Sequence, residues 1–327
     1  MRIDIHTHLA GLGAGHTGCA VSARMRRSLT FQAMMVLTGM RASAASGRED
    51  AAYAEFMACA IDQSRELDYA CLFAMDGVYD AHGALDQRRS HLVVPNSHLF
   101  EACRLSPKLL PVISVNPDRH DAVAELERWG PRAVAIKWLG PLQKFTLSPV
   151  RHARVMDLIK ELELPVIVHT GCEHTFPEME QRLGDPALYE PLLQRGIPVV
   201  FSHCGTGSFV HPGYDYSREF LRLLERYDHA YGDTSAFCSL VRYKQVRRFR
   251  VDRYEGRLLH GSDFPIPSSA VYFLRDLGFS GVARLQGVSS VLDRDVLTKR
   301  AMGMPDATFT AAGELLSAGI KRYRRSS

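Results

Sequence analysis

The sequence predicts an α/β protein built as a closed (β/α)8 barrel. Eight short apolar runs rich in β-branched residues each end in a polar or glycine-containing loop, and helical segments lie between them. Strands that alternate with helices in this way form parallel βαβ units, and eight of them favour a closed barrel over an open sheet. No GxGxxG or GxxxxGK[ST] motif follows a strand, which removes the main support for nucleotide-binding folds.

The expected strands follow one another along the whole chain. They comprise residues 2–9, 68–75, 109–115, 133–139, 165–170, 198–203, 229–234 and 258–263. The clearer helices, with apolar residues at spacings of three and four, comprise residues 49–67, 97–105, 119–129, 149–162, 185–195 and 216–227. Residues 292–325 are expected to add two further helices at or beside the barrel floor. The uninterrupted pattern favours a single barrel domain over residues 1–327.

One long insertion interrupts this alternation. Residues 10–48, between the first strand and the first regular helix, are rich in Gly, Ala, Ser, Met and Arg. A loop of this length in a compact domain is usually functional or disordered, and this one would leave from the face where barrel active sites lie. Residues 29–39 are expected to form a short amphipathic helix. We interpret the insertion as a segment that covers the substrate.

Composition excludes several classes of protein. Hydrophobic residues make up 46% and charged residues 23%, which is typical of a globular protein. No apolar run is long enough for a membrane-spanning helix, and Arg2, Asp4 and His6 do not suit a secretory signal, so a cytoplasmic location is expected. A net charge of +4 gives little support for nucleic-acid binding. The seven cysteines are scattered, with no CxxC pair, and are expected to be reduced.

Polar residues able to do chemistry collect at the carboxyl ends of the expected strands. In a parallel barrel these ends meet at one mouth, so residues far apart in the sequence would converge there. The candidates are His6 and His8 on the first strand, Lys137 on the fourth, His169 on the fifth, His203 on the sixth and Asp263 on the eighth.

Strand alternation gives each candidate a direction, because residues two apart share a face. His6 and His8 would share a face with Asp4, which would lie deeper in the barrel, while Ile3 and Ile5 would take the opposite face.

The same alternation applies to the other strands. Lys137 would share with Ala135 the face that points into the barrel, and His169 would also point inward. His203 shares its face with Phe201, so its inward direction does not follow from alternation alone.

These residue types suit a catalytic metal ion. Two imidazoles at positions i and i+2 of one strand project side by side and can reach one ion. A third imidazole and Asp263 would complete three or four ligands and leave a position for water. Neutral imidazoles with a carboxylate suit zinc, manganese and iron(II). Zinc is the expected ion, with manganese and iron(II) as alternatives. We expect each chain to bind one or two such ions.

Five sequence motifs resemble those of the amidohydrolase superfamily of metal-dependent barrel enzymes. They are DIHTHL, AIKWLG, PVIVHTG, VVFSHCGTG and LLHGSDFP, in this order over residues 3–265. The resemblance is to the amidohydrolase-2 branch, which includes aminocarboxymuconate-semialdehyde decarboxylase. It implies that His6, His8, His169 and Asp263 bind metal, that Asp263 also shuttles a proton, and that His203 polarises substrate, activates water or binds a second ion.

Lys137 has three interpretations. In two-metal members of the superfamily a carboxylated lysine on this strand bridges the ions, and His169 and His203 would then bind the second ion. An unmodified Lys137 could instead bind a substrate carboxylate or phosphate near the metal, or pair with a nearby acid. The related decarboxylases lack this lysine, which disfavours decarboxylation.

Other residues are weaker candidates for the mouth of the barrel. His174 and Glu173 follow the fifth strand, and Arg24 in the insertion could clamp an anion. Asp233, at the end of the seventh strand, could orient a histidine from behind.

The sequence is therefore expected to encode a hydrolase that uses metal-activated water to cleave a C–N or C–O bond of a small molecule, which could carry a carboxylate. In this scheme Asp263 takes the proton of the water, and His203 helps to stabilise the developing oxyanion. A metal-dependent non-oxidative decarboxylase, a metal-free lactonase and a catalytically inactive barrel that binds ligands are the alternatives. The expected partner is a small-molecule substrate, not a nucleic acid or a membrane, and a homodimer is a reasonable expectation for this branch.

Overall fold

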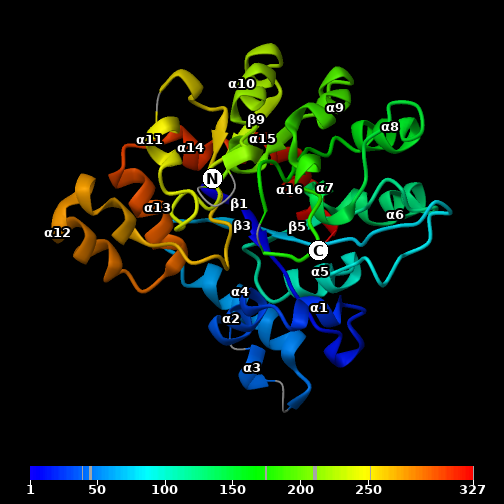
Figure 1. Cartoon of the computed structure of the whole chain (residues 1–327), viewed down its shortest axis with the longest axis horizontal. Helices are drawn as coiled ribbons and strands as arrows, with labels where there is room; N and C mark the ends of the chain where they lie inside the picture. The colour runs from blue at the N-terminus through cyan, green and yellow to red at the C-terminus, as the bar shows by residue number, and fades with distance from the viewer. Residues whose placement is uncertain (39, 44–45, 174, 209–211, 251, 327) are drawn as a thin grey trace.

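Eight parallel strands form the centre of the molecule, a computed structural model that describes residues 1–38, 40–43, 46–173, 175–208, 212–250 and 252–326 (Figure 1). The order of the strands in the sheet follows their order along the chain. They are β1 (Ile3–His8), β3 (Tyr69–Phe73), β5 (Leu109–Ile113), β6 (Ala135–Trp138), β7 (Val166–Val168), β8 (Val199–Phe201), β9 (Ala230–Asp233) and β10 (Leu258–Leu259). Each predicted run contains one of these strands, so the predicted alternation is confirmed.

The last strand returns to the first. The amide of Ile5 donates to the carbonyl of His260 at 2.9 Å, and the amide of Asp263 donates to the carbonyl of His6 at 3.0 Å. Beyond the strand ends, the amide of His8 donates to the carbonyl of Phe264 at 2.9 Å. These bonds bring the two edges of the sheet together, so the sheet forms a nearly closed barrel with β1 and β10 side by side.

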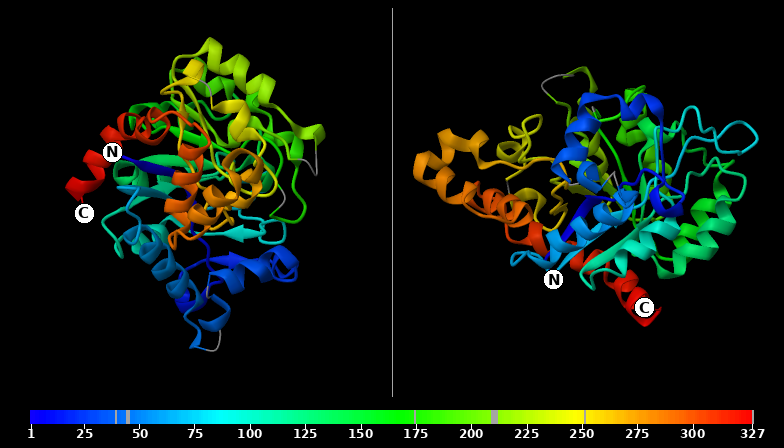
Figure 2. Two further views of the ribbon diagram at one scale, coloured as in Figure 1. Left: turned by 90° about the vertical axis from the view of Figure 1, so that its left-hand side faces the viewer. Right: turned by 90° about the horizontal axis from the view of Figure 1, so that it is seen from below.

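Apolar side chains fill the barrel interior. Ile5, Phe73, Val112 and Val200 belong to one buried cluster that also includes Leu316 from the C-terminal segment. Full burial of each large aliphatic side chain contributes about 1.5–3 kcal/mol. Figure 2 shows the C-terminal segment, in red, beside the start of the chain, where it covers the floor of the barrel.

Helices surround the barrel on its outside. Their apolar stripes face inward, as in α10, which buries Phe220, Leu223 and Leu224. The main helices are α4 (Glu49–Asp62), α5 (Asn96–Cys103), α6 (Ala122–Trp129), α7 (Gly140–Gln143), α8 (Ala153–Glu161), α9 (Glu190–Gln194), α10 (Ser217–Arg226), α11 (Gln245–Phe249), α12 (Leu274–Gln286) and α13 (Val291–Ala301).

The C-terminal region differs from the two helices expected there. After α13 the chain turns at Gly303, whose φ of 85° suits glycine. Three short helices follow in place of one: α14 (Ala307–Thr310), α15 (Ala312–Leu315) and α16 (Ser317–Ser326).

The insertion forms a small lobe of its own, blue in Figures 1 and 2. It contains a short strand, β2 (Ala20–Val21), and the helices α1 (Ala23–Arg26), α2 (Leu29–Leu37) and α3 (Met40–Ser43). Strand β2 pairs antiparallel with β4 (Leu92–Val93), which ties the insertion to the segment after β3. The helix expected over residues 29–39 therefore exists as α2.

The faces of β1 differ from the predicted alternation. The register between β1 and β3 shifts between Asp4 and Thr7, and Ile3 and Ile5 join the interior cluster. Asp4 instead accepts hydrogen bonds from the amides of His6, at 3.0 Å, and Ser262, at 2.9 Å. The expectation that Asp4 shares the inward face with His6 and His8 is wrong, because an irregularity in the strand breaks the two-residue period.

Two further findings concern the chain as a whole. Within the described ranges, no helix combines the length and the apolar character needed to cross a lipid bilayer. All seven cysteines are free, as their scattered positions predicted.

Candidate metal centre

Three side chains predicted as ligands converge at the mouth of the barrel. His6 Nε2 lies 3.1 Å from His8 Nε2 and 3.3 Å from Asp263 Oδ1, and His8 Nε2 lies 3.0 Å from the same oxygen. All three ligand atoms are within 4.8 Å of one another. Two imidazole nitrogens and a carboxylate oxygen are a donor set that zinc, manganese and iron(II) accept, so these residues fit a divalent ion.

A buried carboxylate behind His6 fixes the state of its ring. His6 Nδ1 donates to Asp233 Oδ2 at 2.8 Å, which leaves Nε2 unprotonated and directed at the mouth. Burial, with Lys137 and His8 adding to it, lowers the pKa of His6 well below its usual value. His6 is thus held as the neutral ligand, and Asp233 has the supporting position that its place at the end of β9 suggested.

Asp233 also organises the backbone around it. Its other oxygen, Oδ1, accepts the amide of His203 at 2.8 Å and the amide of Ser235 at 3.0 Å, and the Ser235 hydroxyl donates to it as well. One carboxylate therefore links the ends of β1, β8 and β9.

Exposure increases from the back of the cluster to the front. The side chain of His6 is 1% exposed, that of Asp263 is 12% exposed and that of His8 is 25% exposed. Burial raises the pKa of Asp263, although the hydrogen bond with His8 acts in the opposite direction. The cluster is open on the His8 side, as a site that admits substrate requires.

His203 reaches the site through an unusual backbone conformation. Alternation along β8 would place it with Phe201, which packs in the outer core. Instead the chain turns at His203, whose φ is 56°, and its ring lies 5.3 Å from that of His6 and 5.1 Å from that of His169. Asp263, with a φ of 68°, also lies in the left-handed region.

The hydrogen bonds of His203 define its chemical role. Its Nδ1 lies 3.0 Å from the carbonyl of Ser235, to which it must donate, so Nε2 carries a lone pair. Burial lowers the pKa of His203 well below its usual value, which keeps the ring neutral. An unprotonated Nε2 accepts protons or binds metal, and the oxyanion-stabilising role expected from the sequence, which needs a proton on this atom, stays a prediction.

His169 is in the same chamber but outside the three-residue group. Its Nε2 is buried and has no hydrogen-bond partner, and its Nδ1 lies 3.7 Å from the Glu173 carboxylate. Burial lowers the pKa of His169 to about 3, against the opposing effect of Glu173. The ring is therefore neutral, and its Nε2 can offer an unshared lone pair beside the candidate centre.

Lys137 is fully buried on β6. Its Nζ donates to Ser202 Oγ at 2.9 Å and lies 4.9 Å from the centre of the Phe73 ring. Burial lowers its pKa to about 8, although Asp233, Asp263 and Glu173 act in the opposite direction. An amine of this kind has an appreciable unprotonated fraction near neutral pH, which is the form that reacts with carbon dioxide.

Two hollows open at Asp263. The smaller, of about 100 Å³, is lined by His8 and by apolar residues of the insertion, among them Met25, Phe31 and Met35. The larger, of about 380 Å³, is lined by Glu173, Arg242 and Tyr272. The insertion therefore contributes an apolar wall beside the cluster.

Arg242 is a site residue that the sequence did not reveal. Its side chain is buried, its Nη2 donates to the carbonyl of Cys172 at 2.5 Å, and its Nε is buried without a partner. In the sequence it begins a stretch, Arg242 to Arg250, that is rich in arginine and lysine. No motif distinguishes it from its neighbours, and only the fold turns it toward Asp263.

Two weaker candidates remain, Arg24 and His174. The Arg24 side chain is 62% exposed and pairs with Glu178, and Arg24 lines neither hollow, so its expected role as an anion clamp stays a prediction. His174 lies outside the described residues, so its expected role stays a prediction.

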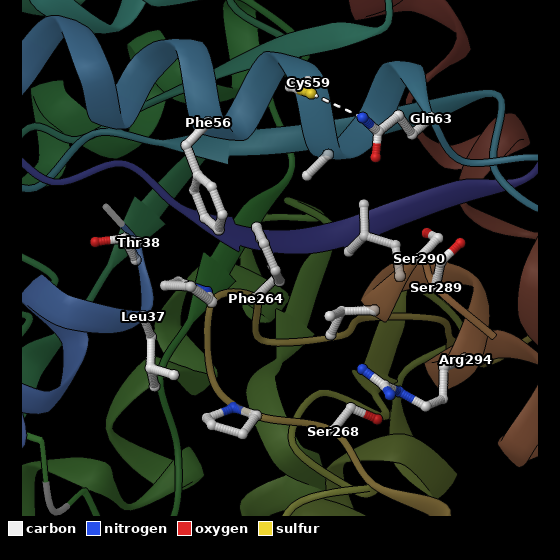
Figure 3. A pocket seen from close by; sticks show the side chains of 15 residues that line it. Leu37, Thr38, Phe56, Cys59, Gln63, Phe264, Ser268, Ser289, Ser290 and Arg294 are labelled. Carbon is white, nitrogen blue, oxygen red and sulfur yellow. Dashed lines mark hydrogen bonds between the residues drawn. The ribbon is translucent and has the colours of Figure 1, made fainter. Parts of the chain in front are cut away.

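Figure 3 shows a third hollow, of about 400 Å³, lined by Phe56, Phe264 and Arg294. Neither His8 nor Asp263 lines this space, so it is separate from the candidate metal centre.

Comparison with known proteins gives a family and a fold. The family model described as Amidohydrolase matches residues 3–299. No curated protein matches the chain. An uncharacterized TIM-barrel protein from Bordetella bronchiseptica is 13% identical, with a TM-score of 0.57, and the match covers 97% of this chain and 99% of that one.

Two further solved structures share the fold. A protein from Pseudomonas putida described as a putative 2-pyrone-4,6-dicarboxylic acid hydrolase is 17% identical, with a TM-score of 0.53 and 97% of each chain covered. A 5-carboxyvanillate decarboxylase from Novosphingobium aromaticivorans, complexed with manganese and 4-hydroxy-3-methoxy-5-nitrobenzoic acid, is 15% identical, with a TM-score of 0.51, and the match covers 97% of this chain and 96% of that one. At these identities the likeness concerns the barrel alone.

Proposed function

The chain belongs to the amidohydrolase family, and we propose that it is a metal-dependent hydrolase that cleaves a C–N or C–O bond, in an amide, lactone or ester, of a small carboxylated molecule. The observation that carries this proposal is the convergence of His6 Nε2, His8 Nε2 and Asp263 Oδ1 within 4.8 Å of one another. Zinc is the proposed ion, with manganese and iron(II) as alternatives.

A divalent ion held by His6, His8 and Asp263 supplies Lewis acidity and makes a bound water acidic enough to react near neutral pH. Asp263 Oδ1 faces the two histidines, whereas Oδ2 accepts no hydrogen bond from the described residues. Oδ2 is therefore free to accept the proton of the attacking water and to return it to the leaving nitrogen or oxygen. The left-handed backbone at Asp263 fixes this orientation.

His203 is proposed as a proton acceptor. Its Nδ1 is occupied by the carbonyl of Ser235, so Nε2 offers a lone pair to the water or to a substrate N–H. If Lys137 is carboxylated, the same Nε2 and that of His169 would hold a second ion. The mass of the intact chain, measured under conditions that preserve a carbamate, distinguishes these two schemes.

Arg242 is proposed to bind a substrate carboxylate. A buried guanidinium whose Nε has no partner gains most from a planar anion that accepts two parallel hydrogen bonds. It lines the larger hollow with Asp263, so a carboxylate bound there would lie on the same side of the substrate as the reacting bond.

One observation favours a second candidate, non-oxidative decarboxylation of an aromatic or unsaturated acid. The apolar wall of Met25, Phe31 and Met35 beside Asp263 suits a flat, unsaturated ring. The two reactions are distinguished by running turnover in 18O-labelled water. A hydrolase incorporates the label into its product, whereas a decarboxylase releases carbon dioxide without doing so.

The experiment that tests the proposed function combines metal removal with a substrate screen. The chain is treated with a chelator, and activity is followed on a panel of carboxylated lactones, amides and esters before and after zinc or manganese is restored. We expect activity to disappear on chelation and to return with metal. Equal activity in the chelated protein would contradict the proposal and favour a metal-free lactonase.

A further inference from the structure

A second group of metal-ligating residues lies where the insertion meets the helices around the barrel. Cys19 precedes β2, Asp50 is in the first turn of α4 and His98 is in α5. Their ligand atoms all lie within 4.8 Å of one another. The cluster shares no residue with the centre at the barrel mouth.

This group is almost completely enclosed. Cys19 is 6% exposed, Asp50 is 0% exposed and His98 is 8% exposed. The Nε2 atom of His98 is buried and has no hydrogen-bond partner. A buried polar atom without a partner costs about 1–3 kcal/mol, so it calls for an occupant that the protein atoms themselves do not supply.

The Asp50 carboxylate is held in place but still has room for a cation. It accepts the amides of Leu12, at 2.5 Å, and Gly13, at 3.0 Å, together with the hydroxyl of Thr17. These donors use three of roughly four lone-pair positions on a carboxylate, and all three are uncharged. The thiol of Cys19 hydrogen-bonds the same carboxylate, so an ion bound here would replace the proton that the two ligands share. The negative charge of the carboxylate suits a metal ion in place of the thiol proton, and the other three donors orient the ligand as supporting groups do in metal sites.

Gly11 leaves open the space beside the thiol of Cys19 and the carboxylate of Asp50. A Cβ atom at this position would lie 2.6 Å from Cys19 Sγ and 2.7 Å from Asp50 Oδ2. Any side chain here would therefore fill the gap between the thiol and the carboxylate. Only glycine keeps this cradle clear.

We propose that Cys19, Asp50 and His98 form a second metal site, distinct from the catalytic centre, which binds zinc or a similar divalent ion and ties the insertion to α4 and α5. Sulfur, nitrogen and oxygen ligands together suit zinc, and binding releases the thiol proton of Cys19 to solvent. Water supplies the fourth ligand. The same residue types also form nucleophilic triads, but a substrate could not reach a cluster this deeply buried.

Cobalt(II) tests the site directly, because only a thiolate ligand gives an intense sulfur-to-cobalt charge-transfer band in the near ultraviolet. The chelated full chain is titrated with cobalt chloride. We expect the band to reach full intensity by about two cobalt ions per wild-type chain, because the barrel mouth takes up the other ion, and by about one ion per chain in a His6→Ala/His8→Ala variant. The band should be lost in Cys19→Ser and His98→Ala, and it should persist in Cys59→Ser, a control that removes an exposed cysteine.

Two further variants separate this proposal from folding defects and from the proposed function. Gly11→Ala removes no ligand, yet it should abolish the band while circular dichroism shows a folded chain. A His6→Ala/His8→Ala double variant should keep the band even if it has lost all activity. Cobalt-loaded wild type without a charge-transfer band, or a band that survives Cys19→Ser or Gly11→Ala, overturns the second site and leaves the proposed function untouched.

Discussion

The two groups of metal-ligating side chains in this molecule are built in opposite ways. His6, His8 and Asp263 come from adjacent strand ends of the barrel and open to solvent at His8, whose side chain is 25% exposed. The group of Cys19 and Asp50 comes from the insertion and the outer helices and is almost fully enclosed. A catalytic ion needs a coordination position that substrate can reach, whereas an ion enclosed by the protein can only hold its ligands together. The difference in exposure therefore favours a catalytic ion at the mouth of the barrel and a structural ion in the insertion.

The two groups also differ in how their ligands are supported. At the barrel mouth a charged group, Asp233, fixes the tautomer of His6. In the insertion, uncharged amides from Leu12 and Gly13 hold the carboxylate of Asp50. Support by a carboxylate raises the basicity of a ligand and tunes a reactive ion, whereas support by amides fixes only its position.

The largest expected effect is a loss of catalytic activity that depends on the metal-ligating group at the barrel mouth and not on the one in the insertion. Asp263→Asn removes the proton acceptor and one ligand from the barrel mouth, and we expect turnover to fall by about 10²–10⁴-fold. The cobalt charge-transfer band of the insertion should be unchanged in the same protein. Steady-state kinetics on the best substrate of the screen and the cobalt titration provide the two readouts. Wild-type turnover in Asp263→Asn would show that the barrel group is not the reaction centre.

Metal affinity gives a sharper contrast. Asp233→Asn can no longer act as a charged acceptor for His6 Nδ1, so we expect metal binding at the mouth to weaken by about 10–100-fold. The insertion site, which Asp233 does not touch, serves as the internal control. Competition with a fluorescent zinc chelator measures both affinities in one protein. An equal loss at both sites would point to a general folding defect.

Substitution of two arginines, one from each region, should affect substrate binding differently. Arg242→Met should raise KM by about 10–100-fold with a smaller change in kcat, because it removes a charged hydrogen bond to a substrate carboxylate worth about 1.5–3 kcal/mol. Arg24→Met in the insertion, where the arginine pairs with Glu178 at the surface, is the matched control and should leave both constants nearly unchanged. The reverse pattern would support the anion-clamping role that the sequence predicts for Arg24 and would contradict the one proposed for Arg242.

The smallest expected effect is on the pH dependence of the free energy of unfolding, through the buried carboxyl group of Asp4. Burial raises the pKa of Asp4 from 3.8 to about 7, against opposing hydrogen bonds from Ser262 and His6 and the charge of Lys299. Between these values the folded chain holds a proton that the unfolded chain has lost. The Asp4 contribution to the free energy of unfolding therefore falls as the pH rises through this window, by at most about 1.4 kcal/mol per pH unit.

Asp4→Asn tests this contribution, since the amide oxygen can still accept both backbone N–H groups. Urea unfolding at about pH 5 and about pH 8 should show a smaller loss of stability with rising pH in the variant than in wild type. Parallel pH profiles for the two proteins would mean that Asp4 is ionised in the folded chain.

The barrel and its ligands could be predicted because both depend on regular patterns. Short apolar runs rich in β-branched residues marked all eight strands, and polar residues at their ends marked His6, His8 and Asp263. Parallel topology then brought distant residues together without further information.

The rest depends on local geometry that a sequence pattern does not encode. His203 reaches the mouth only because its backbone is left-handed, and Asp4 leaves the inward face only because β1 is irregular. Arg242 lies within a run of basic residues. Its sequence context is the same as that of solvent-exposed basic residues, and only its position in the fold distinguishes it from them. Cys19 and His98 carry no ligand spacing, because they come from an insertion and a helix that only tertiary packing brings together.

Metal content of the intact chain tests the central claim most directly. Wild type and the His6→Ala/His8→Ala double variant are equilibrated with zinc, freed of loosely bound ion and analysed by elemental mass spectrometry. With ions at both the mouth and the insertion, wild type should hold about two per chain and the double variant about one. Equal zinc in a folded double variant would contradict a metal centre at the mouth of the barrel.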